Sequence, residues 1–404
     1  MKRAAAACLA MACTAGAAAQ DDRGDFAASK GSALEAQLEA RVKAAVRTVP
    51  GTDTQYLIGG YAQLDGIWSR RRQGGDEQDT FFVSATPFDP ADATGRLSVR
   101  QSQINWVSRT ATPAGHLWSR LEANLFPLDG TTSPTLNQLY LRLDDRIVVG
   151  KTYSTFMDEA ILPTTLDYNG PSGVTFVRQL LARVSVPFGD GWAIQGAVED
   201  PQVDFAAGGA RLGLRTDPRR PDLVARLRYE GERGHVQFAG LWRSIDVTVE
   251  GPLGASERHV SGTGASLSGS LATTGDDTLL WQAVTGKGVG RYFNDPLSAT
   301  GVGLAADRRL ESLRNSGVTV YYQRKWAPDW MTVFGGSTLW IDADGDLRRP
   351  EELKRVVYAS ANLLHRLTPT LVVGAEVMWG EATRVDGEDA TNTRVQVSVR
   401  YLFF

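Results

Sequence analysis

Residues 391–404 read TNTRVQVSVRYLFF, and from Arg394 to Tyr401 polar and apolar side chains strictly alternate. Residues 115–126, GHLWSRLEANLF, repeat this pattern with Leu117 and Leu121 on one side and Arg120 on the other. Successive side chains of a β-strand point to opposite faces, so a period of two is typical of a strand with one dry and one wet face. Both stretches therefore indicate β structure.

Sixteen such runs follow one another from Tyr56 to the C-terminus. They are 56–69, 96–109, 115–126, 135–143, 146–153, 175–187, 191–200, 221–231, 234–246, 259–272, 277–287, 316–326, 330–342, 353–366, 370–382 and 391–404. Run 96–109 is irregular, because its parity switches between Val99 and Ile104, and a β-bulge would reconcile the two halves. The number of runs is even, as in barrels whose neighbouring strands are all antiparallel.

The connections between these runs alternate in length. Seven are short and rich in Gly, Pro or Asp, as tight turns are, and eight are longer. Short turns at one end and long loops at the other are typical of outer-membrane barrels, whose strands need about 9 to 11 residues to cross the apolar layer. We therefore predict an all-β fold, an antiparallel transmembrane β-barrel of about 16 strands over residues 53–404. A secreted carbohydrate-binding β-sandwich remains the alternative.

Tryptophans support the membrane interpretation. Five of them lie near the ends of runs, where amphipathic rings would meet the lipid headgroups. These are Trp192, Trp326, Trp330, Trp340 and Trp379.

The N-terminus reads as a secretory signal. Residues 1–20 combine a basic start, a short apolar stretch and an Ala-x-Ala end at Ala17 to Ala19. Both cysteines of the chain, Cys8 and Cys13, lie in this segment, so its removal leaves no thiol; a lipoprotein attachment at Cys13 is an alternative. Beyond this segment no apolar run approaches the roughly 18 to 20 residues of a membrane helix. We predict location in the outer membrane of a Gram-negative cell, spanned by strands.

A helix is expected at residues 31–47, where Leu34, Leu38 and Val42 recur on one face. A lone amphipathic helix of this length is marginal in water and must pack on something. Two alternatives stay open, docking against its own domain or a short coiled coil between copies of the chain. Residues 21–52 are accordingly predicted to form an N-terminal periplasmic segment.

Composition excludes some classes. The chain carries 46 Asp and Glu against 43 Lys and Arg, and 42% of its residues are hydrophobic. A near-neutral chain lacks the concentrated basic surface that nucleic acid requires, and this apolar content is too high for a disordered chain. No nucleic-acid partner is therefore expected.

Basic side chains dominate the face that we assign to the interior. A narrow basic channel concentrates anions, and arginine can hold a carboxylate through two parallel hydrogen bonds. Barrel interiors also carry paired Arg and Glu ladders that only satisfy one another, so anion preference is a separate hypothesis. The predicted pore-lining residues are Arg120, Arg142, Arg183, Arg226, Arg228, Arg243, Arg394, Arg400 and Lys151, with Lys325 as a further member.

Residues 151–173, KTYSTFMDEAILPTTLDYNGPSG, resemble the segment after the fifth strand of the DcaP family of trimeric outer-membrane porins. The similarity extends to FFVSATPFD at 81–89, RQSQINW at 100–106, FVRQ at 176–179 and GWAIQGAVEDPQVD at 191–204. It implies a sixteen-stranded homotrimer with an N-terminal periplasmic coiled-coil segment, and a basic pore for passive diffusion of dicarboxylates or other small organic anions.

The same resemblance implies that residues 154–173 fold inward as a constriction loop. Its carboxylates Asp158 and Glu159 would then face the arginine wall across the pore. For Asp167 a role as turn former is preferred, because a carboxylate near a Gly-Pro turn commonly caps the local backbone.

Other chemistry finds little support. The four histidines, His116, His235, His259 and His365, are scattered and not at metal-ligand spacing. A barrel enzyme that hydrolyses lipid is an alternative function, and His235 is its only candidate residue. The run DADGD at 342–346 is interpreted as a turn. We predict no catalytic site, no metal site and no cofactor.

Overall fold

The computed structural model describes residues 41–73, 79–127, 130–201, 214–216, 219–249, 256–295, 301–304, 310–342 and 347–403. The predicted signal segment, both cysteines and residues 31–40 of the expected helix lie outside these ranges, as does most of the DADGD run. Within the described ranges, no helix is long and apolar enough to span a membrane.

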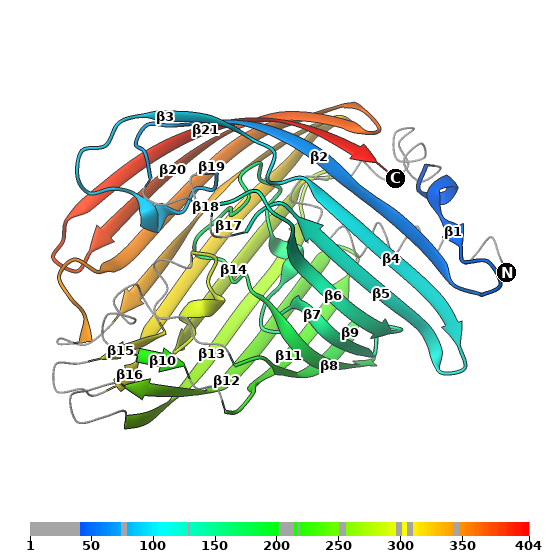
Figure 1. The fold of residues 1–404 in the computed structure, drawn as a ribbon, viewed down its shortest axis with the longest axis horizontal. Helices are drawn as coiled ribbons and strands as arrows, with labels where there is room; N and C mark the ends of the chain where they lie inside the picture. The colour runs from blue at the N-terminus through cyan, green and yellow to red at the C-terminus, as the bar shows by residue number, and fades with distance from the viewer. Residues whose placement is uncertain are drawn as a thin grey trace.

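The chain forms a closed antiparallel barrel of sixteen strands (Figure 1). The strands are β2 (Gln55–Ser69), β4 (Gln103–Thr112), β5 (Gly115–Asn124), β6 (Thr135–Leu143), β7 (Ile147–Tyr153), β8 (Arg178–Phe188), β9 (Trp192–Glu199), β11 (Asp222–Gly231), β12 (Gly234–Val249), β13 (Ser256–Ala272), β14 (Thr278–Lys287), β17 (Arg314–Ala327), β18 (Trp330–Asp342), β19 (Leu353–Thr368), β20 (Leu371–Arg384) and β21 (Asp389–Phe403). Each pairs with its neighbours in sequence, and β2 pairs with β21 to close the ring. The predicted fold class is confirmed.

Smaller elements lie at the ends of the barrel strands and in the loops. Strand β1 (Arg47–Thr48) pairs with the start of β2, β10 (Leu214–Thr216) pairs with β12, and β15 (Val302–Leu304) pairs with β16 (Leu310–Ser312) in a long loop. Three single 3-10 turns, η1 (Val83–Ala85), η2 (Glu159–Ile161) and η3 (Gly290–Tyr292), lie in loops.

The irregular run at 96–109 is two strands rather than one bulged strand. Strand β3 (Thr94–Ser98) pairs with the far half of β2, whereas β4 pairs with its near half. The chain turns at Arg100 and Gln101 between them, and both side chains are buried. This interruption explains why exposed Leu97 and exposed Ile104 differ in parity.

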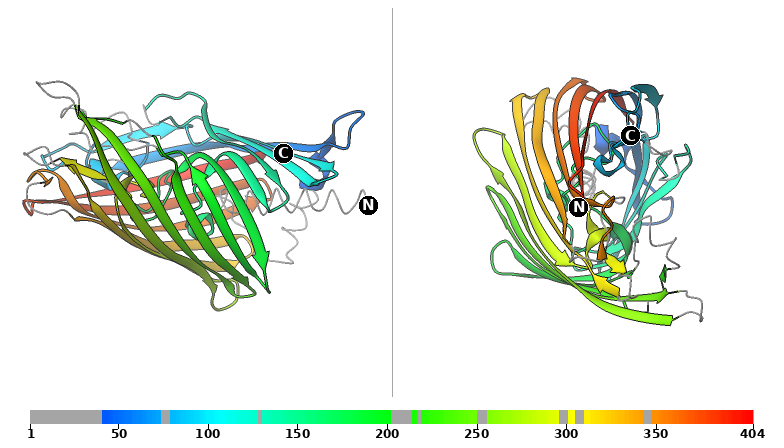
Figure 2. Two further views of the ribbon diagram at one scale, coloured as in Figure 1. Left: turned by 90° about the horizontal axis from the view of Figure 1, so that it is seen from below. Right: turned by 90° about the vertical axis from the view of Figure 1, so that its left-hand side faces the viewer.

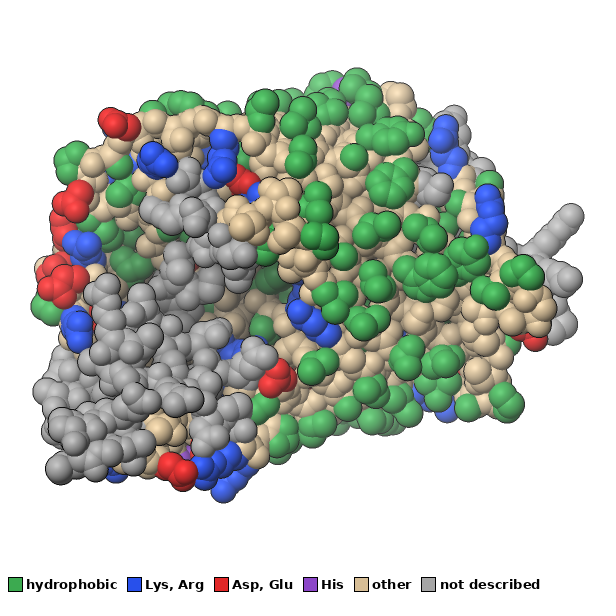
Figure 3. All heavy atoms as spheres, viewed as in Figure 1, with side chains coloured by type: hydrophobic (Ala, Val, Ile, Leu, Met, Phe, Trp, Pro, Cys, Tyr) green, Lys and Arg blue, Asp and Glu red, His purple; other side chains and the backbone are tan. Residues whose placement is uncertain are grey.

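The outward face of the barrel is apolar. Hydrophobic side chains are spread over the upper and right-hand parts of the face drawn in Figure 3, and many of the charged side chains lie at its left end. All five tryptophans predicted at the strand ends are exposed there. Near the short turns, Phe188 stacks on Trp192 at 6.3 Å between ring centroids, and Trp192 contacts Tyr229 at 5.0 Å. These rings form an aromatic girdle of the kind found at membrane interfaces.

The inside of the barrel is divided into a dry side and a basic side. Segments of several loops lie within the ring of strands (Figure 2). The inward side chains of β12, β14 and β17 to β20 pack against three of these loops, through residues such as Phe81, Phe156 and Tyr292, in one large hydrophobic cluster. Loops rather than water therefore cover the inner face on this side. Buried polar side chains, such as Gln237, Asn362 and Glu376, lie among the apolar ones.

Residues 41–48 of the N-terminal segment dock on the barrel. Residues 41–45 are helical, and the chain then extends into β1. Val42 packs with Leu57 and Trp118, whose side chains project inward near the short-turn end. For residues 41–46 the contacts are thus with the chain's own barrel.

Candidate functional site on the basic side of the barrel interior

Strand parity places all eight predicted arginines on the inner face. On β11, for example, Leu223 and Leu227 are exposed outward, whereas Arg226 and Arg228 alternate with them. The same alternation turns Arg394 and Arg400 of β21 inward, opposite exposed Val395 and Val397.

Lys151 does not share this orientation. It follows the parity of exposed Ile147 and Val149 on β7, and it pairs across the sheet with Leu139 and Leu180, which are also exposed outward. Its placement on the inner face was therefore an error: the parity of Ile147 and Val149 assigns it to the outer face, where a charged residue near the end of a strand is tolerated.

The inward arginines fall into two groups by exposure. Arg142, Arg183, Arg226 and Arg228 keep part of their surface open, whereas Arg120, Arg243, Arg394 and Arg400 are buried. Arg243 is 1% exposed; it contacts Asp222 at 3.3 Å and donates to the carbonyl of Gly288 at 3.0 Å. These four buried residues hold loops and neighbouring side chains and do not line water, which corrects their assignment as pore-lining.

The partly exposed arginines form an arc across neighbouring strands. Arg142 pairs through Val148 of β7 with Arg183 of β8. Arg226 of β11 lies opposite Gln195 of β9 and bonds to its side chain. The charges of Arg142, Arg183 and the buried Arg120 all act on the hydroxyl of Tyr140, so this wall has a concentrated positive potential.

Some members of the arc are neutralised by carboxylates. Arg142 contacts Asp145 of the adjoining turn at 3.2 Å, and Arg228 contacts Asp158 at 3.0 Å. Within the part of the chain that the structure describes, no carboxylate lies within ion-pair distance of Arg183 or Arg226. The neutral partners of Arg226 are Gln195 and the carbonyl of Met157, to which it donates at 3.2 Å. The arc therefore has net positive charge at its centre.

The loop at 154–177 reaches this wall through Asp158. The carboxylate accepts hydrogen bonds from Arg228 at 3.0 Å and from Ser268 at 2.6 Å, and it lies 2.8 Å from Nε2 of His235. It also caps η2 by accepting from the backbone N–H of Ala160 at 3.2 Å. Burial alone would raise the pKa of Asp158, but the bond to His235 and the charge of Arg228 outweigh it and lower the pKa. Asp158 is thus an ionised anchor for the loop tip.

Glu159, the next residue, is the carboxylate that stays partly exposed. Its charge acts on both Tyr140 and Arg226, so it lies near the arc without being buried in it. The basic wall and one loop carboxylate therefore face the same space.

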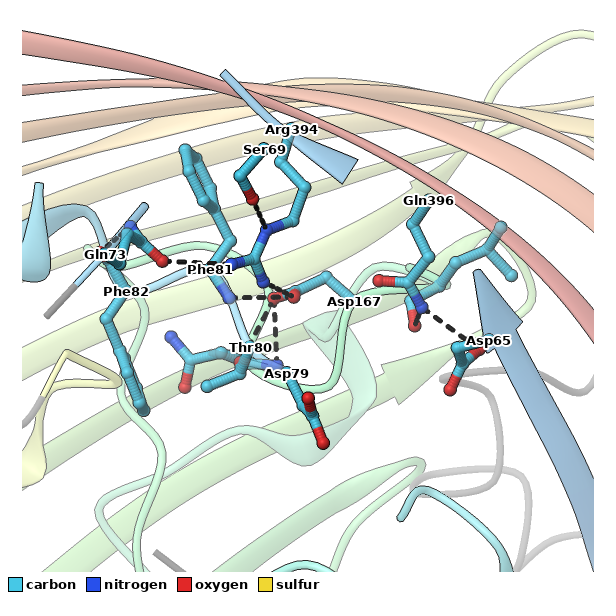
Figure 4. A network of polar contacts seen from close by, with 12 residues as sticks. Asp65, Ser69, Gln73, Asp79, Thr80, Phe81, Phe82, Asp167, Arg394 and Gln396 are labelled. Carbon is cyan, nitrogen blue, oxygen red and sulfur yellow. Dashed lines mark hydrogen bonds and ion pairs between the residues drawn. The ribbon is translucent and has the colours of Figure 1, made fainter. Parts of the chain in front are cut away.

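The other end of the loop is held by Asp167 (Figure 4). Its carboxylate accepts from the backbone N–H groups of Phe81 at 2.9 Å and of Asn169 and Gly170 at 3.0 Å each. Arg394 lies 3.9 Å away and also donates to Ser69 and Gln73. Burial raises the pKa of Asp167 in spite of the Arg394 charge. Asp167 acts as turn former and loop anchor.

Arg109 is a basic residue of this side that the sequence analysis did not identify. It lies on the inner face of β4, and its guanidinium is 5.5 Å from the ring of Trp118, while Arg142 approaches the same ring at 5.1 Å. The row Arg109, Trp118 and Arg142 crosses three neighbouring strands. The broken parity of run 96–109 hid this residue.

The histidines do not form a metal site or an exposed catalytic site. Among the described residues, no group of three or more His, Cys, Asp or Glu side chains could hold a metal ion. His235 lies between Asp158 and Ser270, whose Oγ is 2.8 Å from Nδ1. It is buried inside the barrel rather than on the lipid face. Its carboxylate partner is already bound by Arg228 and Ser268, which is consistent with a structural role.

Comparison with known proteins establishes the fold. No protein-family model matches the chain, and no curated protein matches it. The outer membrane channel DcaP of Acinetobacter baumannii is similar in structure, with a TM-score of 0.78 at 16% identity over 89% of this chain and 100% of that chain. An anion-selective porin from Comamonas acidovorans has a TM-score of 0.58 at 10% identity, over 87% and 100%. OmpT of Vibrio cholerae has a TM-score of 0.55 at 10% identity, over 88% and 100%. The chain therefore has the DcaP-like fold of an outer-membrane porin.

Proposed function

We propose that this protein is a passive diffusion channel for small anionic solutes, which cross along the arginine arc. The observation that carries the proposal is the position of Arg183 and Arg226, inward and partly exposed, with no carboxylate within ion-pair distance among the described residues. Positive charge in a low-dielectric passage raises the local concentration of anions and repels cations. The likeness to an anion-selective porin supports this proposal.

Organic dicarboxylates are the proposed solute class. Neighbouring guanidinium groups, each able to hold a carboxylate by two parallel hydrogen bonds, suit a solute with two carboxylates. The positive charges of Arg183 and Arg228 both act on Arg226, which supports a wall on which two guanidinium groups share one solute. The opposing carboxylate of Glu159 would limit how tightly the solute binds, so that it can leave again.

Three further properties belong to this proposal. The chain acts as a homotrimer in outer-membrane lipid, its N-terminal residues 21–52 lie in the periplasm after removal of residues 1–20, and it catalyses no reaction. The docked residues 41–46 lie at the end of the barrel that has the short turns. Outer-membrane barrels have their short turns on the periplasmic side, which supports a periplasmic placement of the N-terminal residues.

Liposome swelling tests the solute class. Proteoliposomes are diluted into isotonic solutions of a four-carbon dicarboxylate, a neutral polyol of similar size or a four-carbon diamine. Swelling should be faster with the dicarboxylate than with the diamine. The double variant Arg183→Gln and Arg226→Gln should lose that preference and keep its polyol rate. Arg324→Gln, on the outward face beside Trp326 at 4.3 Å, is the control and should behave as the parent. Equal rates for dicarboxylate and diamine in the parent protein would reject the proposal.

A further inference from the structure

Lys151 presents an ammonium group on the lipid-facing side of the barrel. The side chains that flank it across the sheet, Leu139 and Leu180, are 48% and 60% exposed. Its Nζ donates to the carbonyl of Leu136 at 2.9 Å, and among the residues that the structure describes no second acceptor takes up the other two hydrogens of the ammonium group. A charged side chain on this face is tolerated only near a membrane interface, where polar groups can reach it.

Its depth matches such an interface. Leu180, the partner of Lys151, precedes Phe188 on β8 by eight residues, and Phe188 belongs to the aromatic girdle near the short turns. At a rise of about 3.3 Å per residue and a tilt of about 40°, these residues are roughly 20 Å apart along the membrane normal. An apolar band about 25 Å tall places Lys151 close to its upper edge, toward the long loops.

A groove of about 630 Å³ adjoins this position on the outer wall. Its floor is apolar and includes Val149, Leu180 and Val198, which face outward. Its upper rim carries Arg219 and Arg220, both exposed, together with Asp200. Arg219 contacts Glu257 at 2.5 Å. Lys151 follows Gly150 and pairs with Leu180, two residues that line the groove, so the basic groups border one site.

We propose that this groove binds a phosphorylated glycolipid of the outer leaflet. The apolar floor accommodates an acyl chain, and Lys151 and Arg220 contact the phosphate of the headgroup. Charge complementarity selects this occupant, because lysine and arginine at headgroup depth favour anionic lipid, and an apolar floor continuing into the bilayer favours a chain over a free ion. The site lies outside the channel and is independent of the proposed solute path.

Native mass spectrometry of the full-length protein in detergent tests this inference. The protein is titrated with diphosphorylated lipid A, with the same lipid lacking both phosphates, and with inorganic phosphate as competitor. The double variant Lys151→Leu and Arg220→Gln is compared with Arg146→Gln, a charge change on an exposed residue of a short turn at the opposite end. Heat-modifiable migration on gels confirms that each variant forms the barrel.

We expect the parent protein to retain one lipid A per chain. The double variant should retain lipid A at least tenfold more weakly, and Arg146→Gln should retain it as the parent does. The phosphate-free lipid should bind the parent and the double variant equally weakly, and inorganic phosphate should not displace lipid A. Equal retention of lipid A by the parent and the double variant would overturn the inference. Equal binding of both lipid forms by the parent protein would also overturn it. So would a change of oligomeric state in the double variant with unaltered lipid binding, because that result would identify the groove as a contact between copies.

Discussion

Replacing Asp158 with Asn should release the tip of the loop at 154–177. The side chain keeps its shape, and an amide oxygen can still cap η2, but the ion pair with Arg228 and the charge-assisted bonds from Ser268 and His235 are lost. Loss of one partner of a buried pair costs about 3 to 5 kcal/mol, and we take about 3 because the Arg228 side chain is 18% exposed and also contacts Glu230. Because about 1.4 kcal/mol is a factor of ten, the detached loop should become about 100 times more populated.

Single-channel recording in planar bilayers measures this effect. The variant should show rapid current fluctuations and a changed mean conductance, because a charged segment now moves in the passage. Asp145→Asn is the matched control, since Asp145 also pairs with an arginine of the arc but is 92% exposed, and such surface pairs contribute about 0 to 1 kcal/mol. If Asp158→Asn showed no more current fluctuation than Asp145→Asn, the loop would not be held by this carboxylate.

Four further predictions follow from the contacts described. The pKa of Asp158 is lowered in the folded protein, so its anchoring of the loop should be fully present above the ordinary Asp pKa of about 3.9 and should weaken as the pH falls below it. Current noise in the parent channel should therefore stay constant from pH 8 to about 5 and rise only in stronger acid. Glu159→Gln should increase anion preference, measured as a shift in reversal potential, because it removes a partly exposed loop carboxylate whose charge acts on Arg226. Gly60→Ala should fold poorly in refolding assays, because φ is 151° and a Cβ would lie 2.1 Å from the carbonyl oxygen of Gln103, whereas Gly240→Ala has open space and should fold normally. Trp118→Ala should lower the free energy of unfolding in urea by about 3 kcal/mol, because Val42, Arg109 and Arg142 all contact this ring, whereas Trp326→Ala at the exposed girdle should change it far less.

The barrel could be predicted from the sequence because it rests on local periodicity. Successive strand residues point alternately to the outer and the inner face of the barrel. The predicted ranges 135–143 and 330–342 coincide with β6 and β18. The alternation failed where a strand was interrupted, at residues 99–102, because a period of two needs several consecutive residues to be recognised. At Lys151 the alternation held, and the error came from assigning a charged residue to the inner face against the parity of Ile147 and Val149.

The candidate site could be predicted only in part. Parity identified which arginines face inward, but it could not show that loops bury Arg243 and Arg394. Their burial depends on residues distant in sequence, such as Tyr292 near Arg243 and Phe81 near Arg394. For the same reason the sequence suggested a role in the pore for Asp158 without showing that Arg228, His235 and Ser268 bind it. Long-range packing of loops inside the barrel, rather than strand periodicity, decides which inward charges meet water.

The reversal potential of the purified channel across a planar bilayer, with a tenfold gradient of potassium chloride, measures most directly whether the arginine arc selects anions. We predict a potential of the sign that chloride permeation produces, reduced toward zero by Arg183→Gln with Arg226→Gln and unchanged by Arg324→Gln. A potential of the sign that potassium permeation produces, or one that the double substitution leaves unaltered, would contradict it.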